Sequence, residues 1–142
     1  MTSTGQARLF KISFPAIDCY FSGTGDMFAA LMVCRLRQAV SQVPGLSERS
    51  KWLSDDSVAA TELPLAKAAE KVLPSMHEIL VKTCEGMTDM YSRERQKREA
   101  RLGRSLNEQE AQAVKSKCAE LKIARNIGCL FEPPETFSAT AL

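Results

Sequence analysis

Long hydrophobic runs are missing from this sequence of 142 residues. The longest uninterrupted apolar stretch, residues 27–34, is far too short to span a bilayer. The N-terminus also lacks the apolar segment that a secretory signal peptide carries. We therefore expect no membrane partner, and the cytoplasm is the predicted location.

Metal-binding and disulfide patterns are also missing. The five cysteines are odd in number, widely spaced and free of any Cys-x-x-Cys pair, so neither a zinc site nor a disulfide framework is indicated. They are expected to be reduced and mostly buried thiols: Cys19, Cys34, Cys84, Cys118 and Cys129. The only histidine, His77, has no partner in the sequence pattern and is interpreted as structural.

The chain has little excess charge. Its net charge of +2 does not argue for nucleic acid, and 44% hydrophobic with 25% charged residues is typical of a globular protein. The charged run at residues 93–101 mixes acids with bases and contains no aromatic residue. A solvated helix with i,i+4 ion pairs is favoured there, and contact with phosphates is the alternative.

The most informative motif is Gly23-Thr24-Gly25-Asp26, between a strand-like stretch and an apolar helix pattern. Glycines let the backbone turn tightly and approach a ligand, and a helix N-terminus offers free N–H groups to a phosphate. A carboxylate at that position can orient a hydroxyl and take its proton during phosphoryl transfer. An ordinary turn with Asp26 as helix cap is the alternative. Neither G-x-G-x-x-G nor a Walker loop fits, because Phe28 replaces the third glycine and no Gly-Lys-Ser/Thr follows.

Strand patterns occur at both ends of the chain. Residues 9–14 alternate as a strand does, residues 17–21 predict a second strand before the glycine turn, and residues 136–142 predict a closing edge strand.

Helix patterns lie between these strands. We expect a buried helix from residue 26 to about 40, a striped amphipathic helix over 65–83 that Pro74 kinks or divides, and a helix that begins with a capping box at Ser105–Glu108. The stretch 46–63 is expected to be loop-rich.

Three blocks resemble the ribokinase-like small-molecule kinases, and pyridoxal kinase most of all. Residues 17–31 are similar to the signature region, residues 68–80 to the helix that follows it, and residues 137–142 to the terminal strand. The resemblance implies the C-terminal part of a three-layer α/β/α fold, helix-rich with a few short strands. By this resemblance, residues 1–142 are expected to be part of one kinase domain, in which 46–63 and 90–110 are loop or charged insertions. Family members are considerably longer, so we expect a fragment that is weakly active or inactive by itself.

The same resemblance implies transfer of the γ-phosphoryl group of ATP to the 5′-hydroxymethyl group of pyridoxal, with Mg²⁺. Asp26 is the implied base, and Gly23, Thr24 and Gly25 form the implied anion hole. A nucleotide pocket is implied for a further set of residues: Phe21, Ser22, Val72, Met76 and Leu80. No residue is assigned to the metal, because the Asn107-x-x-Glu110 pattern follows the glycine motif, whereas the family's metal-organising pattern precedes it. The family also implies a homodimer.

Two alternatives stay open. The chain can be a noncatalytic remnant that serves as a protein interaction module, because strand edges and an apolar helix stripe would be left without partners. It can also come from a related hydroxymethylpyrimidine or sugar kinase, which would share Asp26. The sequence does not define the substrate or the oligomeric state.

Overall fold

The computed structural model describes residues 2–49 and 51–142, so Ser50 in the predicted 46–63 insertion lies outside the described residues. The described part is helix-rich, as predicted. Its helices are α1 (Thr24–Ser41), α2 (Pro64–Leu102), α3 (Glu108–Cys118) and α4 (Gly128–Phe131), with 3₁₀ turns at η1 (Ala60–Glu62) and η2 (Ala124–Asn126). Two short strands, β1 (Phe10–Lys11) and β2 (Thr140–Ala141), pair antiparallel with Phe10 opposite Ala141.

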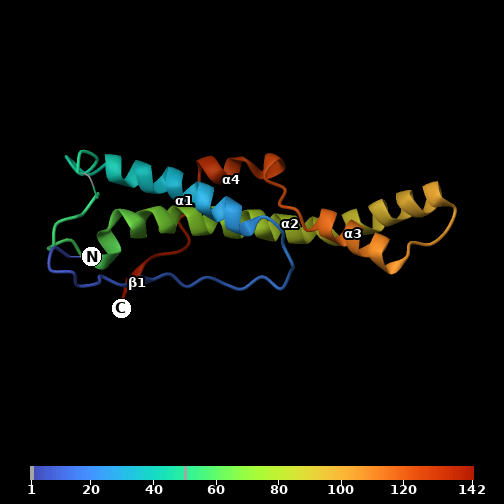
Figure 1. Cartoon of the computed structure of the whole chain (residues 1–142), viewed down its shortest axis with the longest axis horizontal. Helices are drawn as coiled ribbons and strands as arrows, with labels where there is room; N and C mark the ends of the chain where they lie inside the picture. The colour runs from blue at the N-terminus through green and yellow to red at the C-terminus, as the bar shows by residue number, and fades with distance from the viewer. Residues whose placement is uncertain (1, 50) are drawn as a thin grey trace.

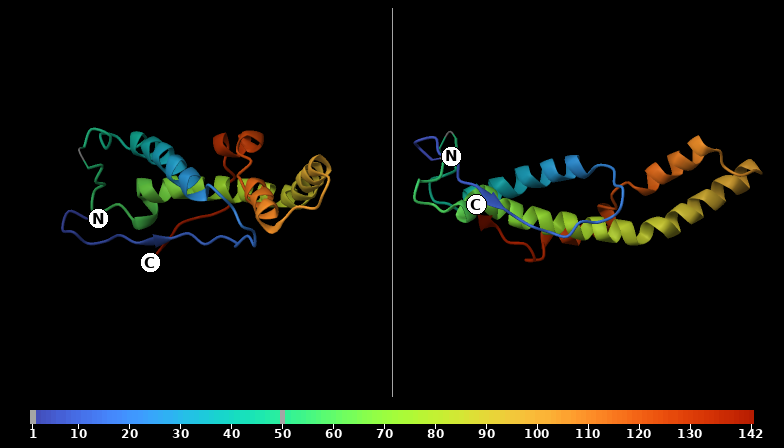
Figure 2. Two further views of the ribbon diagram at one scale, coloured as in Figure 1. Left: turned by 45° about the vertical axis from the view of Figure 1, so that its right-hand side comes forward. Right: turned by 90° about the horizontal axis from the view of Figure 1, so that it is seen from below.

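The long helix α2 is the axis of the molecule (Figure 1). Helices α1 and α4 lie against its first half, and α3 folds back along its far end as an antiparallel helical hairpin. The N-terminal segment runs extended along another side of α2 before it reaches α1, as the two views of Figure 2 show. The chain is therefore elongated, with a body at one end and the hairpin at the other.

Helix α2 has clear sequence reasons for its bounds. Pro64 occupies its first turn, where a missing N–H costs nothing, and Gly103 ends it in the left-handed conformation with its N–H donated to Glu99 O. Pro74 is buried inside the continuous helix, so of the two predicted alternatives the division is wrong, and the kink stays a prediction. The charged run 93–101 is helical and contains the expected i,i+4 pair between Arg95 and Glu99.

The core that fixes the first turn of α1 is small. Met27, Ile79 and Cys129 bury their side chains together, and these three residues come from α1, α2 and α4. Partly buried apolar residues surround them: Leu31, Met76, Leu121 and Leu130. Because Met27 directly follows Asp26, this core sets the position of the glycine motif on the middle of α2.

The predicted helix after residue 26 is confirmed, but its predicted burial is wrong. Among the described residues of α1, only Met27 and Val40 are buried, and Val33 is 71% exposed. Helix α2 covers one side of α1, and the short helix α4 contacts it through Arg35, which donates to the carbonyl oxygens of Leu130 and Phe131. The apolar residues of the remaining faces therefore meet solvent in this chain.

The predicted strands are shorter than their patterns. Residues 9–14 give only β1, residues 136–142 give only β2, and residues 17–21 form no strand. A strand needs a hydrogen-bonding neighbour, and in the described chain β1 and β2 have only each other. The three-layer arrangement stays a prediction.

The loop-rich interpretation of 46–63 agrees with the described residues, which contain only η1. The Arg8 guanidinium organises this loop, because it donates hydrogen bonds to the carbonyl oxygens of Ser54, Asp55 and Val58 at 3.3, 2.8 and 2.9 Å. Leu46, the first residue of this stretch, is buried. Whether 46–63 and 90–110 are insertions stays a prediction.

The cysteine prediction is partly wrong. Cys19 and Cys84 form a disulfide between residues 65 positions apart, which the sequence spacing did not indicate. Cys118 and Cys129 are free and buried as expected, whereas Cys34 is free and exposed. Burial raises the pKa of the Cys118 thiol.

Candidate functional site

The glycine motif forms the start of α1. Gly23 has φ +87°, the left-handed conformation that glycine adopts without a steric penalty, and Thr24 is the first helical residue. Gly23 O accepts a hydrogen bond from Met27 N at 3.2 Å. The sequence thus places a tight turn where it is needed, and the helix axis begins directly after it.

The first turn of α1 has unused donors. Within residues 2–49 and 51–142, no protein acceptor binds the backbone N–H groups of residues 23–26, and Gly23 offers no side chain to cap them. Unsatisfied N–H groups and the positive end of the helix dipole together favour an anion. The turn therefore has the donors that an anion hole needs.

The turn is fixed to the body from three directions. Ser22 N donates to Ala119 O at 3.0 Å, in an isolated parallel bridge between Ser22 and Glu120. The disulfide ties Cys19, four residues before Gly23, to α2. Met27 completes the attachment through the core. A turn held on both flanks keeps its N–H groups in one geometry, which favours preorganised binding.

The carboxylate of Asp26 lies at the same end of α1, exposed to solvent. In the described part of the chain it has no hydrogen bond or ion pair. It is therefore not serving as a side-chain cap, which weakens the alternative interpretation of the motif. The carboxylate can accept a proton from a hydroxyl that approaches the free N–H groups.

The structure divides the predicted nucleotide-pocket residues. Phe21, Met76 and Leu80 line one apolar hollow of about 410 Å³, whereas Ser22 is exposed in the bridge to Glu120. Val72 is only 1% exposed and belongs to the packed interior, where a ligand cannot reach it.

Sequence reasoning missed Phe28 as a residue of this hollow. Phe21 and Phe28 flank the glycine motif in sequence and both line the hollow, so the apolar space lies beside the start of α1. His77 also lines it, and its ring stands edge-on to Phe137 with centroids 5.4 Å apart. This packing supports the structural interpretation of His77.

The described residues contain no group of three or more His, Cys, Asp or Glu side chains that could hold a metal ion. The Asn107-x-x-Glu110 pattern forms a capping box, because Asn107 Oδ1 accepts from Glu110 N at 2.8 Å and Glu110 Oε2 accepts from Asn107 N at 2.9 Å. The cap thus lies two residues beyond the predicted Ser105–Glu108.

A glycine turn with free N–H groups, a nearby carboxylate and an adjacent apolar hollow thus lie together at the start of α1 in this chain. Two Schizosaccharomyces pombe proteins, each named "putative pyridoxal kinase", are similar to it. They are 33% identical over 81 residues and 30% identical over 79 residues, which is 56% of this chain and 22% of each relative. The chain is thus related to pyridoxal kinases over part of its length, as its motifs predict.

The chain spans about a fifth of the length of these curated relatives. No protein-family model matches it. No solved structure matches it either. No described helix is long and apolar enough to cross a membrane.

Proposed function

We propose that this chain supplies the phosphate-binding turn and the general base of an ATP-dependent pyridoxal kinase. The hydroxyl oxygen of the 5′-hydroxymethyl group attacks the γ-phosphorus, the bond to the β,γ-bridging oxygen breaks, and ADP and pyridoxal 5′-phosphate form. The hydroxyl proton goes to the carboxylate of Asp26. The cytoplasmic location and the homodimer expected from the sequence stay predictions.

Gly25 carries this proposal. Its φ is not positive, and an added Cβ would meet no atom within 4 Å, so neither the backbone conformation nor the packing requires a glycine there. Glycine in a helix costs stability relative to alanine. A ligand that approaches the first turn of α1 closely explains why glycine stands at this position, and phosphate oxygens suit the free N–H groups.

The chain's own residues stabilise charge in two ways in this mechanism. The N–H groups of residues 23–25 would donate to the oxygens of the transferred group, on which charge spreads in the transition state. Thr24 can add its hydroxyl to the same oxygens. Asp26, at the positive end of a helix, is a weak base, so it orients the attacking hydroxyl and takes the proton late.

Magnesium would neutralise the phosphates when ATP is bound. Because the described residues offer no ligand set for it, the ATP phosphates themselves would supply oxygen ligands. The apolar hollow beside Phe21 and Phe28 is large enough for an aromatic ring and is the proposed place for the adenine.

The test is a coupled assay of pyridoxal-dependent ADP release, run on the chain and on Asp26→Ala. We expect weak turnover in the unmodified chain and none in Asp26→Ala, while both bind ATP with similar affinity because the N–H groups are unchanged. Equal turnover in the two proteins would eliminate Asp26 as the base. Competition by hydroxymethylpyrimidine and by sugars tests the related kinases that share this aspartate.

An interaction module is the second candidate, and a specific observation favours it. Val33 of α1 is 71% exposed, and Ile127 and Phe131 are 51% and 73% exposed. Exposed apolar side chains of this size bind another protein where they form one contiguous patch. Full ATP binding without any turnover in the unmodified chain would favour this candidate over the enzyme.

A further inference from the structure

Positive charge is concentrated in one part of the chain. Residues 93–125 contain ten Lys and Arg but five Asp and Glu, a net charge of +5, so the remainder carries −3 of the total of +2. These residues form the outer part of α2, α3 and the segment that returns to the body. The small net charge of the whole chain therefore conceals a basic arm.

Ion pairs inside the arm occupy several of its acids. Glu99 accepts from Arg95 at 3.0 Å, and Glu110 accepts from Arg104 at 2.9 Å. Glu94 is paired with Lys117 of α3 at 3.1 Å. Of these pairs, Glu94–Lys117 joins α2 to α3, and within the described residues the other seven cations of the arm form no ion pair.

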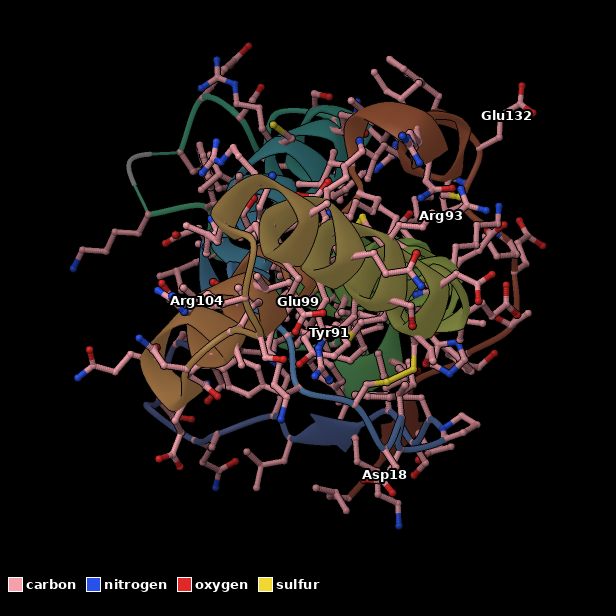
Figure 3. All side chains as sticks on the ribbon, turned by 90° about the vertical axis from the view of Figure 1, so that its right-hand side faces the viewer. Asp18, Tyr91, Arg93, Glu99, Arg104 and Glu132 are labelled. Carbon is pink, nitrogen blue, oxygen red and sulfur yellow. A yellow bond between two sulfur atoms is a disulfide. The ribbon has the colours of Figure 1, made fainter. Side chains whose placement is uncertain are left out.

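Four cations of the arm, together with Lys82, line one hollow of about 750 Å³ at the base of the arm, between α2 and residues 122–126. We call it the basic hollow, and its cations are Lys82, Arg93, Lys97, Lys122 and Arg125. In Figure 3, Arg93 and Arg104 lie on opposite sides of α2, and the α3 hairpin lies on the side of Arg104. The hollow therefore opens on another side of α2 from Arg104, and Glu94 in its lining also pairs with Lys117 of α3.

The cations of the basic hollow are mostly uncompensated. Lys82 pairs with Glu78 at 2.6 Å, but within the described residues the side chains of the other four have no hydrogen bond or ion pair. Two acids face the same space, and one of them, Glu94, is already paired with Lys117. Asp89 is the other. Like charges that converge in one concave space repel one another unless an anion binds between them.

The two walls of the basic hollow are fixed relative to each other. Lys122 N, in one wall, donates to Oγ1 of the buried Thr83 of α2, in the other wall, at 3.3 Å. Asn126 Nδ2 donates to Lys122 O at 2.9 Å, which closes the segment on itself. The cations of both walls therefore stay close without a ligand, which reduces the entropy that binding must overcome.

We propose that the basic hollow binds a small anion that carries several phosphate groups. Arg and Lys side chains are the usual partners of phosphate oxygens, and charge-assisted hydrogen bonds are the strongest of their kind. No aromatic residue lines the basic hollow, so it has no platform on which a nucleobase could stack. Its ligand is recognised through the phosphates alone, at a place distinct from the glycine turn.

Isothermal titration of the full chain with sodium tripolyphosphate tests this site. The double variant Arg93→Gln with Lys97→Gln removes two cations of one wall, and we expect its Kd to rise about tenfold or more. The double variant Arg101→Gln with Lys115→Gln is the matched control. It removes the same two residue types from exposed positions on the arm, outside the hollow, and its Kd should stay within about twofold.

A second variant, Lys122→Gln with Arg125→Gln, removes the cations of the opposite wall and should weaken binding as much as the first. All variants are checked by far-UV circular dichroism, which should be unchanged because these side chains make no described hydrogen bond. Equal weakening in the matched control would show general attraction to the arm and overturn the site, as would no binding to the unmodified chain. If Gly23→Ala abolishes tripolyphosphate binding while the hollow variants retain it, the glycine turn binds the probe, and this inference fails while the proposed kinase site survives.

Discussion

Replacement of Gly25 by alanine should change the stability of the fold and the affinity for a ligand in opposite directions. Gly25 is the second residue of α1, outside the left-handed region, with open space where a Cβ would stand. Alanine is favoured over glycine in a helix, and it also reduces the freedom of the unfolded chain. We therefore expect Gly25→Ala to raise the free energy of unfolding by about 0.4–1 kcal/mol.

The same methyl group should weaken ATP binding. If the phosphates approach the N–H groups at the start of α1, a side chain on Gly25 obstructs one or more charge-assisted hydrogen bonds, each worth about 1.5–3 kcal/mol. This corresponds to a loss of roughly tenfold or more in affinity. The expected combination, a more stable protein that binds ATP less well, is uncommon and hard to obtain by nonspecific damage.

Urea unfolding followed at 222 nm and isothermal titration with ATP measure the two effects. Gly23→Ala is the control, because its φ of +87° should make alanine cost about 1–2 kcal/mol and lower both stability and affinity. The anion-hole assignment is refuted if Gly25→Ala is stabilised as expected and still binds ATP as tightly as the unmodified chain.

Two further predictions concern the stability of the fold. The double variant Cys19→Ser with Cys84→Ser opens a loop of 65 residues, and loop entropy predicts that the free energy of unfolding in urea falls by about 4 kcal/mol. The variant Cys34→Ser, at a free and exposed cysteine, is the control and should change this free energy little. Equal losses in the two proteins would contradict the prediction. Arg104 lowers the pKa of Glu110 from 4.5 to about 2, so this contribution to stability is complete above pH 4.5 and disappears as pH falls through about 2. The melting temperature of the unmodified chain should fall over that pH range more steeply than the melting temperature of Glu110→Gln. Parallel falls in the two proteins would show that the ion pair contributes nothing to stability.

Local signals in the sequence predicted the helices well. Gly23 and the following apolar residues indicate where α1 begins, and the stripe over 65–83 lies within α2. These features depend on neighbours a few residues apart, which a sequence displays directly. The start of α3 was missed by two residues because both Ser105–Glu108 and Asn107–Glu110 have capping-box spacing, and only geometry selects between them.

Features that depend on distant partners were not predictable in the same way. The alternation in residues 9–14 is a strand pattern, but strand length depends on what lies beside it, and only Phe10–Lys11 finds a partner in the described chain. Nothing local indicates that Cys19 would reach Cys84, because the N-terminal segment must first run back along α2. The basic hollow also escaped detection, since it combines α2 with residues 122–126.

The exposed side of α1 connects the two functional candidates. Burying a side chain such as Val33 against a partner would contribute about 1.5–3 kcal/mol to the free energy of binding. A protein surface that fits this face of α1 should therefore bind it whether the chain is a kinase or an interaction module. The two candidate functions differ in which groups the bound partner must leave accessible. A kinase requires that Asp26 and the N–H groups of the first turn stay open to ATP and an alcohol, whereas an interaction module has no such requirement. Because Asp26 lies at the N-terminal end of α1 and Val33 about two turns further on, a partner can cover the second without blocking the first. The apolar face therefore does not argue against catalysis, and ATP binding by Gly25→Ala remains the measurement that decides what the motif does.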